Sequence, residues 1–108
     1  MATTSSDAEG PGGLPSAVVE DLLSARNRRL ALSTLADRGE PMVVESLATA
    51  VVAARENCPE SVVSADQREA MCDELYTEHI PKLTATGVLR YDSMKGAVEL
   101  VRPGVVEG

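Results

Sequence analysis

Positively charged side chains are scarce in this sequence, and those placed to bind an anion fall into two groups. The chain has 10 Lys and Arg residues against 17 Asp and Glu residues, which gives a net charge of −7. Arg26, Arg28 and Arg29 are close neighbours, whereas Arg90 and Lys95 flank a short turn-like segment. Guanidinium and ammonium groups pair with phosphate oxygens, so both groups are candidate contacts to a nucleic-acid backbone. The alternatives are that Arg28 or Arg29 pairs with acidic side chains and holds the domain together, and that Lys95 is a solvated turn residue.

A second set of candidates lies on a helix that we expect over residues 65–85. Its outward side chains include Gln67, Arg68 and Thr77, which could contact base edges or phosphates. The other five of these outward side chains are carboxylates, namely Asp66, Glu69, Asp73, Glu74 and Glu78. Carboxylates repel a phosphate backbone, and this argues against simple insertion of the helix into a DNA groove.

Residues that could support catalysis or bind a metal do not form a recognisable site. Cys58 and Cys72 lack the spacing of a zinc-binding pair, and His79 is the only histidine. There is no nucleophile with a base at a known spacing and no glycine-rich phosphate loop. We therefore expect no enzyme activity, no cofactor and no metal site. Cys72 should be a buried reduced thiol, with a disulfide or a catalytic pair with Cys58 as the alternative. His79, beside Pro81 on an apolar helix face, should be a packed side chain bonded to a backbone carbonyl, with a ligand or a pH switch as the alternative.

The helix over residues 65–85 is the clearest of the elements that must position these side chains. Ser64 and Gln67 have the spacing of a capping box at its start, and apolar side chains recur every four residues along one face. Pro81 lacks the amide hydrogen that would bond to the carbonyl of Thr77, so we expect a kink or break near residues 79–80. Tyr76 should lie in the core or in a dimer contact.

A β-hairpin should follow this helix. Gly87 is suited to ending a helix, and residues 88–92 and 97–101 are rich in strand formers on either side of the turn-like segment 93–96. The predicted pairs are Tyr91 with Val98, Leu89 with Leu100, and Arg90 with Glu99. This register is self-consistent, because the apolar pairs share one face and an ion pair lies on the other.

The rest of the chain should supply supporting helices and two tails. Residues 1–13 are expected to be a disordered tail and residues 103–108 a frayed end, which leaves residues 14–102 as the folded domain. Ser16 and Ser24 are candidate caps for helices over 17–23 and 25–37, or for one bent helix, and Gly39 should end it. Residues 42–43 should add a short strand and residues 44–56 a further helix. The predicted fold is α+β, a winged helix-turn-helix of three to four helices with a C-terminal β-hairpin wing.

The composition indicates a soluble, cytoplasmic protein with an aliphatic core. No apolar run approaches the roughly 20 residues that span a bilayer, and the N-terminus lacks a signal-peptide pattern. Phe and Trp are absent and there are 2 Tyr residues, so Leu, Val, Ala, Ile and Met must form the core. An acidic, lysine-poor chain is similar to proteins of salt-accumulating microbes, although an acidic mesophilic domain would share these features.

Three stretches of this chain resemble a family of small winged-helix domains from halophilic archaea, which are mostly uncharacterised and assumed to be transcriptional regulators. They are the arginine-rich stretch 23–29, the stretch 75–83 with its His-Ile-Pro-Lys-Leu sequence, and the stretch 87–92 at the entry to the wing. The resemblance implies a winged-helix fold and a regulatory role. The family usually has a second histidine two residues before His79, where this chain has Thr77. A site built from a histidine pair is therefore not expected.

These observations lead to two functional hypotheses. The first is a winged-helix DNA-binding protein, a transcriptional regulator that contacts double-stranded DNA through the wing and the preceding helix and forms a homodimer. Its candidate DNA contacts are Gln67, Arg68, Thr77, Arg90, Lys95, Arg28 and Arg29. Val18, Leu22 or Leu30 could remain exposed and favour self-association. The alternative, favoured by the acidic helix, is a protein-interaction or dimerisation module that does not bind DNA.

Overall fold

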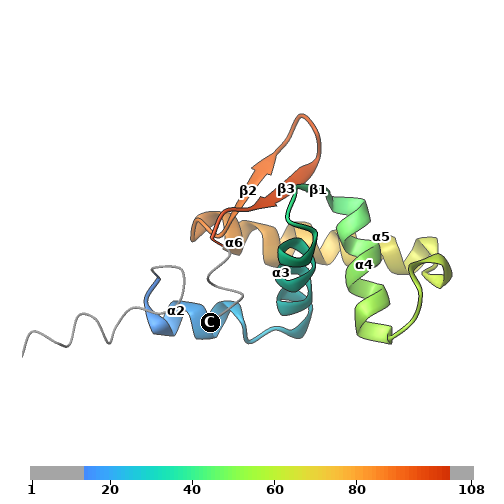
Figure 1. The fold of residues 1–108 in the computed structure, drawn as a ribbon, viewed down its shortest axis with the longest axis horizontal. Helices are drawn as coiled ribbons and strands as arrows, with labels where there is room; N and C mark the ends of the chain where they lie inside the picture. The colour runs from blue at the N-terminus through green and yellow to red at the C-terminus, as the bar shows by residue number, and fades with distance from the viewer. Residues whose placement is uncertain (1–13, 103–108) are drawn as a thin grey trace, which may run out of the picture.

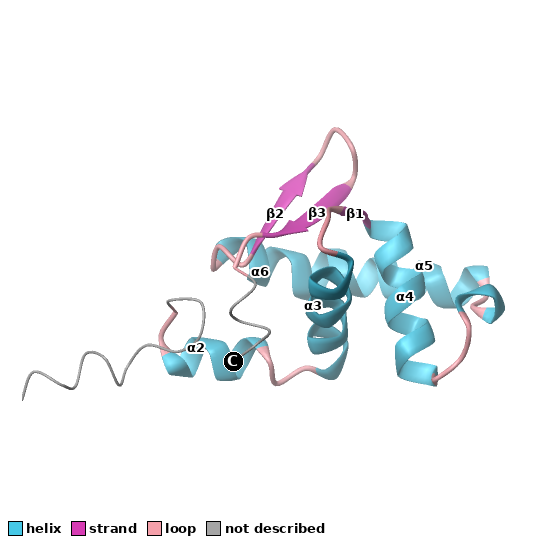
Figure 2. Cartoon of the chain, in the orientation of Figure 1, coloured by secondary structure: helices cyan, strands magenta, loops and turns pink. Residues whose placement is uncertain are grey.

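The computed structural model describes residues 14–102, so the predicted tails 1–13 and 103–108 lie outside the described residues. The helices are α2 (Ser16–Leu22), α3 (Arg26–Arg38), α4 (Val44–Glu56), α5 (Ala65–Glu74) and α6 (Ile80–Ala85). The strands are β1 (Met42–Val43), β2 (Leu89–Asp92) and β3 (Ala97–Leu100), which form an antiparallel sheet in the order β1-β3-β2. The sheet covers the top of the helices in Figure 1, and its hairpin projects beyond them (Figures 1 and 2). The α+β fold predicted from the sequence is confirmed.

The core is aliphatic, as the composition requires. The largest fully buried side chains are Leu22, Leu32, Leu35, Leu47, Leu75, Leu83, Val44, Val51, Val52, Val88 and Val98. Helix α4 is central, because it packs against both α3 and α5 and the first of its residues follows directly from β1. Burying one Leu or Val side chain stabilises a fold by about 1.5–3 kcal/mol, so this cluster is the main source of stability.

The first two helices are separate, and their N-terminal caps differ from the prediction. Pro15 rather than Ser16 is the N-cap of α2, with no side-chain cap bond, because Ser16 is already helical. Ser24 does not cap α3 either, since its hydroxyl donates to the carbonyl of Asp21 at 2.7 Å and closes the turn after α2. The predicted end of α3 is confirmed: Gly39 adopts φ = 69°, and its amide bonds to the carbonyl of Leu35.

The helix before the hairpin begins as predicted, and a π-helical turn interrupts its α-helical pattern close to the expected kink. Ser64 and Gln67 form the capping box at the start of α5. A π-helical turn, Leu75–His79, then joins α5 to α6, and the amide of Ile80 bonds to the carbonyl of Leu75. The π-helical turn ends two residues before Pro81, which has no amide hydrogen to donate to a helical hydrogen bond. Because a π-turn holds one extra residue, both His79 and Ile80 point into the protein, where they are 2% and 6% exposed.

The hairpin has the predicted register. Leu89 pairs with Leu100, Arg90 with Glu99 and Tyr91 with Val98. The predicted third strand is also present, since Met42 pairs with Val98 and makes β3 the central strand. Leu89 and Val98 are buried against the helices, which fixes which face of the sheet is inward.

The described surface gives limited support to the proposed self-association patch. Leu22 is fully buried, so the prediction that it could be exposed is wrong. Val18 and Leu30 are partly buried and pack against the core. Within residues 14–102, no helix is long and apolar enough to cross a membrane.

Candidate nucleic-acid interface

Two of the predicted contacts on the helix already have their polar groups in use. Gln67 accepts a hydrogen bond from the amide of Ser64 at 2.9 Å, because its side chain completes the capping box. The hydroxyl of Thr77 donates to the carbonyl of Asp73 at 2.7 Å. Arg68 is half-buried on the same helix. The helix therefore presents fewer groups to a ligand than its sequence suggested.

The charge around the middle of this helix is negative. The pKa of the Cys72 thiol is raised, first by burial and then by the nearby carboxylates of Glu45, Asp73 and Glu69, while Arg68 acts in the opposite direction. Glu45 lies in the first turn of α4, so carboxylates from two helices meet here. The cysteine is free, and it is half-buried rather than fully buried as predicted. A phosphate backbone would be repelled by this surface.

The wing carries its two positive side chains on an exposed surface. Arg90 Nη1 lies 3.1 Å from Glu99 Oε1, and both side chains are largely exposed, at 68% and 46%. Together with Lys95, Asp92 and Pro41, these residues line a hollow of about 140 Å³. The structure thus brings Arg90 and Lys95 together, as predicted, but places carboxylates beside them.

The tip of the wing is shaped by Asp92. Its Oδ1 accepts hydrogen bonds from the amides of Met94 at 3.0 Å and Lys95 at 3.3 Å. Gly96 follows with φ = 63°, a left-handed conformation that suits glycine. Met94 is 92% exposed at this tip. The loop is therefore held in one shape by a short side chain and presents an apolar group next to Lys95.

Two tyrosines join the wing to the helix. The rings of Tyr76 and Tyr91 meet edge to face, with centroids 6.1 Å apart and planes at 89°. A hydrogen bond with Tyr91, together with burial, raises the pKa of Tyr76. Tyr76 is 44% exposed, so it does not lie in the core, and the alternative that it forms a dimer contact stays a prediction. The pair braces the free edge of the hairpin.

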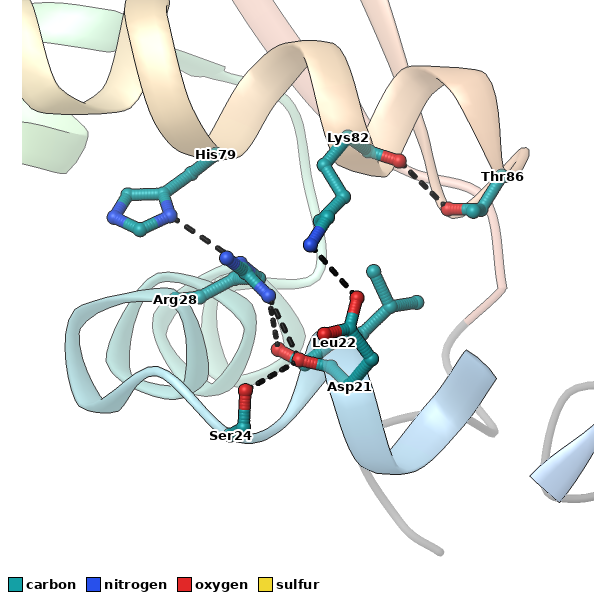
Figure 3. A network of polar contacts seen from close by, with 7 residues as sticks. All are labelled: Asp21, Leu22, Ser24, Arg28, His79, Lys82 and Thr86. Carbon is teal, nitrogen blue, oxygen red and sulfur yellow. Dashed lines mark hydrogen bonds and ion pairs between the residues drawn. The ribbon is translucent and has the colours of Figure 1, made fainter. Parts of the chain in front are cut away.

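The predicted arginine group at the start of α3 is far from the wing and serves another purpose. In Figure 1 the beginning of α3 lies at the bottom of the molecule and the hairpin at the top. Arg28 is 7% exposed, and its Nη1 donates to the carbonyls of Asp21 at 2.9 Å and Leu22 at 3.2 Å (Figure 3). Arg29 is exposed and donates to the carbonyl of Leu23 at 2.6 Å. Arg28 is buried and cannot contact DNA, which corrects its place among the predicted contacts.

His79 is buried, as predicted, but its partners are side chains. Nε2 lies 2.7 Å from Glu74 Oε2, and Nδ1 lies 3.2 Å from Arg28 Nε. The expected bond to a backbone carbonyl is wrong, because the π-turn directs the ring toward α3 and Glu74. Asn27 also donates to Glu74 Oε2 at 2.8 Å. Burial raises the pKa of Glu74, but the hydrogen bonds from Asn27 and His79 outweigh it and leave that pKa lowered.

A separate hollow of about 650 Å³, which the sequence did not indicate, lies between α3, α4 and the link after α4. Ala50, Ala53 and Ala54 contribute small side chains to it, and the 3-10 turn Glu60–Val62 closes one side. Arg38 and Glu60, 3.6 Å apart, pair at its rim. The hollow is wide open to solvent, and within residues 14–102 no group of three potential metal ligands is found there or elsewhere.

A helical core, a long helix that leads into a hairpin, and a short strand from the preceding link define the winged-helix-like class of protein. Residues 20–99 match the model of a domain of unknown function, DUF7344, and the chain belongs to that family. No curated protein and no solved structure matches the chain. The match supports the predicted membership of an uncharacterised family, whereas the halophilic origin and the regulatory role stay predictions.

Proposed function

We propose that this chain is a winged-helix DNA-binding protein of the cytoplasm, a transcriptional regulator whose phosphate contacts come mainly from the wing. The observation that carries the proposal is the projecting hairpin, where Arg90 and Lys95 line one hollow next to the exposed tip residue Met94. Wings of this class contact phosphates or the minor groove, while the preceding helix approaches the major groove. Secondary contacts in this proposal are Gln67, Arg68 and Thr77. Arg29 could contact DNA only at a point far from the wing.

The charge distribution supports a weak electrostatic contribution to binding. Arg90 is next to Glu99, and the helix carries the carboxylates that surround Cys72. Each phosphate contact contributes about 0.9 to the slope of log K against log salt. A wing that supplies two such contacts therefore gives a slope of about −2, and binding of this kind persists at salt concentrations that abolish the binding of a basic protein.

The test is a salt series of binding to random and genomic double-stranded DNA, followed by fluorescence anisotropy. The variant Arg90→Ala with Lys95→Ala should lose affinity for all sequences alike and lower the magnitude of the salt slope by about 2. The matched control, Arg38→Ala with Arg55→Ala, removes the same charge away from the wing. Unchanged binding of the wing variant in molar salt, or an equal loss in the control, rejects the proposal.

A second candidate is a protein-interaction module with the same fold, and the acidic surface around Cys72 and Tyr76 favours it. Selection of defined promoter fragments from genomic DNA by the purified chain at high salt would eliminate this candidate.

Self-association is part of both proposals, and the partly buried side chains Val18 and Leu30 are the candidate contacts between two copies of the chain. If sedimentation velocity shows only monomer at high protein concentration, self-association is rejected.

A further inference from the structure

The polar network that joins α2, α3 and the π-turn has a defined arrangement of protons. Arg28 Nε can only donate, so His79 Nδ1, 3.2 Å away, must accept. A neutral imidazole has one N–H, which must then be on Nε2 and must donate to Glu74 Oε2 at 2.7 Å. Figure 3 shows the histidine ring pointing at the guanidinium group, which in turn reaches the end of α2. The network works only with the neutral histidine in this one tautomer.

We propose that Arg28, His79 and Glu74 form an acid-sensitive switch that ties the end of α2 to the π-turn, and that protonation of His79 loosens α2. A protonated ring carries hydrogen on both nitrogens, so Nδ1 changes from an acceptor into a donor that faces the N–H of Arg28. The contact with Glu74 survives, since Nε2 still donates to a carboxylate. Arg28 is therefore the partner that is displaced. When its guanidinium group moves away, its hydrogen bonds to the carbonyls of Asp21 and Leu22 are lost.

The other charged groups around His79 do not change charge in the same pH range. From α3 and α4, Arg28 and Arg55 stay charged, because guanidinium groups do not lose their proton in proteins. The hydrogen bond from Lys82 lowers the pKa of Asp21, and hydrogen bonds from Asn27 and His79 lower the pKa of Glu74. Both carboxylates thus remain ionised from about pH 8 to about pH 5, the range in which histidine side chains titrate. His79 is therefore the member of this network whose protonation the proposal invokes.

A second tie between α2 and α6 provides an internal comparison. Lys82 Nζ lies 2.7 Å from Asp21 Oδ2 on the surface, beside the buried network (Figure 3). This ion pair does not involve His79. Acidification to about pH 5 should leave it in place, so α2 becomes looser without dissociating.

The first experiment reads the proton directly. His79 is the only histidine in the sequence, so the imidazole nitrogen signals of an untagged, ¹⁵N-labelled sample need no assignment. At about pH 8 the spectra should show the neutral ring with hydrogen on Nε2. A ring with hydrogen on Nδ1, or one charged at this pH, overturns the proposal without any mutation.

The second experiment measures hydrogen exchange of the α2 amides between about pH 8 and about pH 5, corrected for intrinsic rates, with the α4 amides as reference. Protection of α2 should fall about tenfold or more on acidification, while that of α4 changes little. His79→Gln, which keeps a donor and an acceptor but cannot take up a proton, should abolish this pH dependence. Lys82→Met is the control and should retain it. Constant α2 protection in the natural chain, or persistence of the pH dependence in His79→Gln, contradicts the switch, whether or not the chain binds DNA.

Discussion

Arg28 and Arg90 make contacts of almost the same length in opposite environments. Arg28 Nε is 3.2 Å from His79 Nδ1, and Arg90 Nη1 is 3.1 Å from Glu99 Oε1. Arg28 is 7% exposed, whereas the side chain of Arg90 is 68% exposed. A buried charge that loses a partner keeps the full cost of its desolvation, but an exposed charge is solvated by water instead. The buried network should therefore control stability and the wing pair should not.

The largest effect is expected for Arg28→Met. This change leaves His79 Nδ1 and two backbone carbonyls without their donor, so the free energy of unfolding should fall by about 3 kcal/mol in urea denaturation at neutral pH. Arg38→Met, which breaks an exposed ion pair with Glu60, is the control and should cost less than about 1 kcal/mol. Equal losses in the two variants would remove the distinction between the buried and the exposed region.

A smaller effect with a defined pH dependence is expected for Glu74→Gln. The pKa of Glu74 is lowered in the folded chain, so its ionised form stabilises the fold above the pKa of the unfolded chain. That stabilisation is lost as the pH falls through the folded pKa. The variant should cost about 1.5 kcal/mol at neutral pH, and this cost should shrink as the pH falls through the lowered folded-state pKa of Glu74, where the natural chain loses the same contribution. Urea denaturation over this pH range measures the difference, and a pH-independent cost contradicts it.

Tyr91→Ala tests the aromatic contact between the two regions. Loss of the edge-to-face contact with Tyr76 should destabilise the chain by about 1 kcal/mol, because both rings are partly exposed. The hairpin amides should lose hydrogen-exchange protection before those of α4 do, since β2 is at the edge of the sheet. Tyr91→Phe keeps the ring contact and is the control. If Tyr91→Ala lowered the free energy of unfolding as much as Arg28→Met does, the wing would be as important for stability as the buried network.

The contrast between the exposed wing and the buried network also explains which contacts could be predicted from the sequence. Arg90 and Glu99 lie in one hairpin, so alternation and a glycine-ended turn were enough to predict their pairing. The capping box and the end of α3 at Gly39 also depend on near neighbours. The partners of Arg28 are set by how α2, α3 and the π-turn pack, and no local pattern reports that packing. Glu74 lies five residues before His79, and a π-turn could have suggested this contact, but the sequence indicated only a kink at Pro81.

The smallest effect is expected in a double-mutant cycle on the wing. Arg90→Ala and Glu99→Ala should each change stability by less than about 0.5 kcal/mol, with a coupling energy of similar size, because water and salt screen an exposed pair. A parallel cycle with Arg28→Met and His79→Gln should give a coupling energy of about 1 kcal/mol or more, since the two side chains share one buried network.

Under the proposed function, Glu99→Ala should also strengthen DNA binding, because it frees Arg90 for a phosphate. Stability that depends on the wing pair, or DNA affinity that falls in Glu99→Ala, would mean that Arg90 holds the hairpin together rather than serving as a ligand contact.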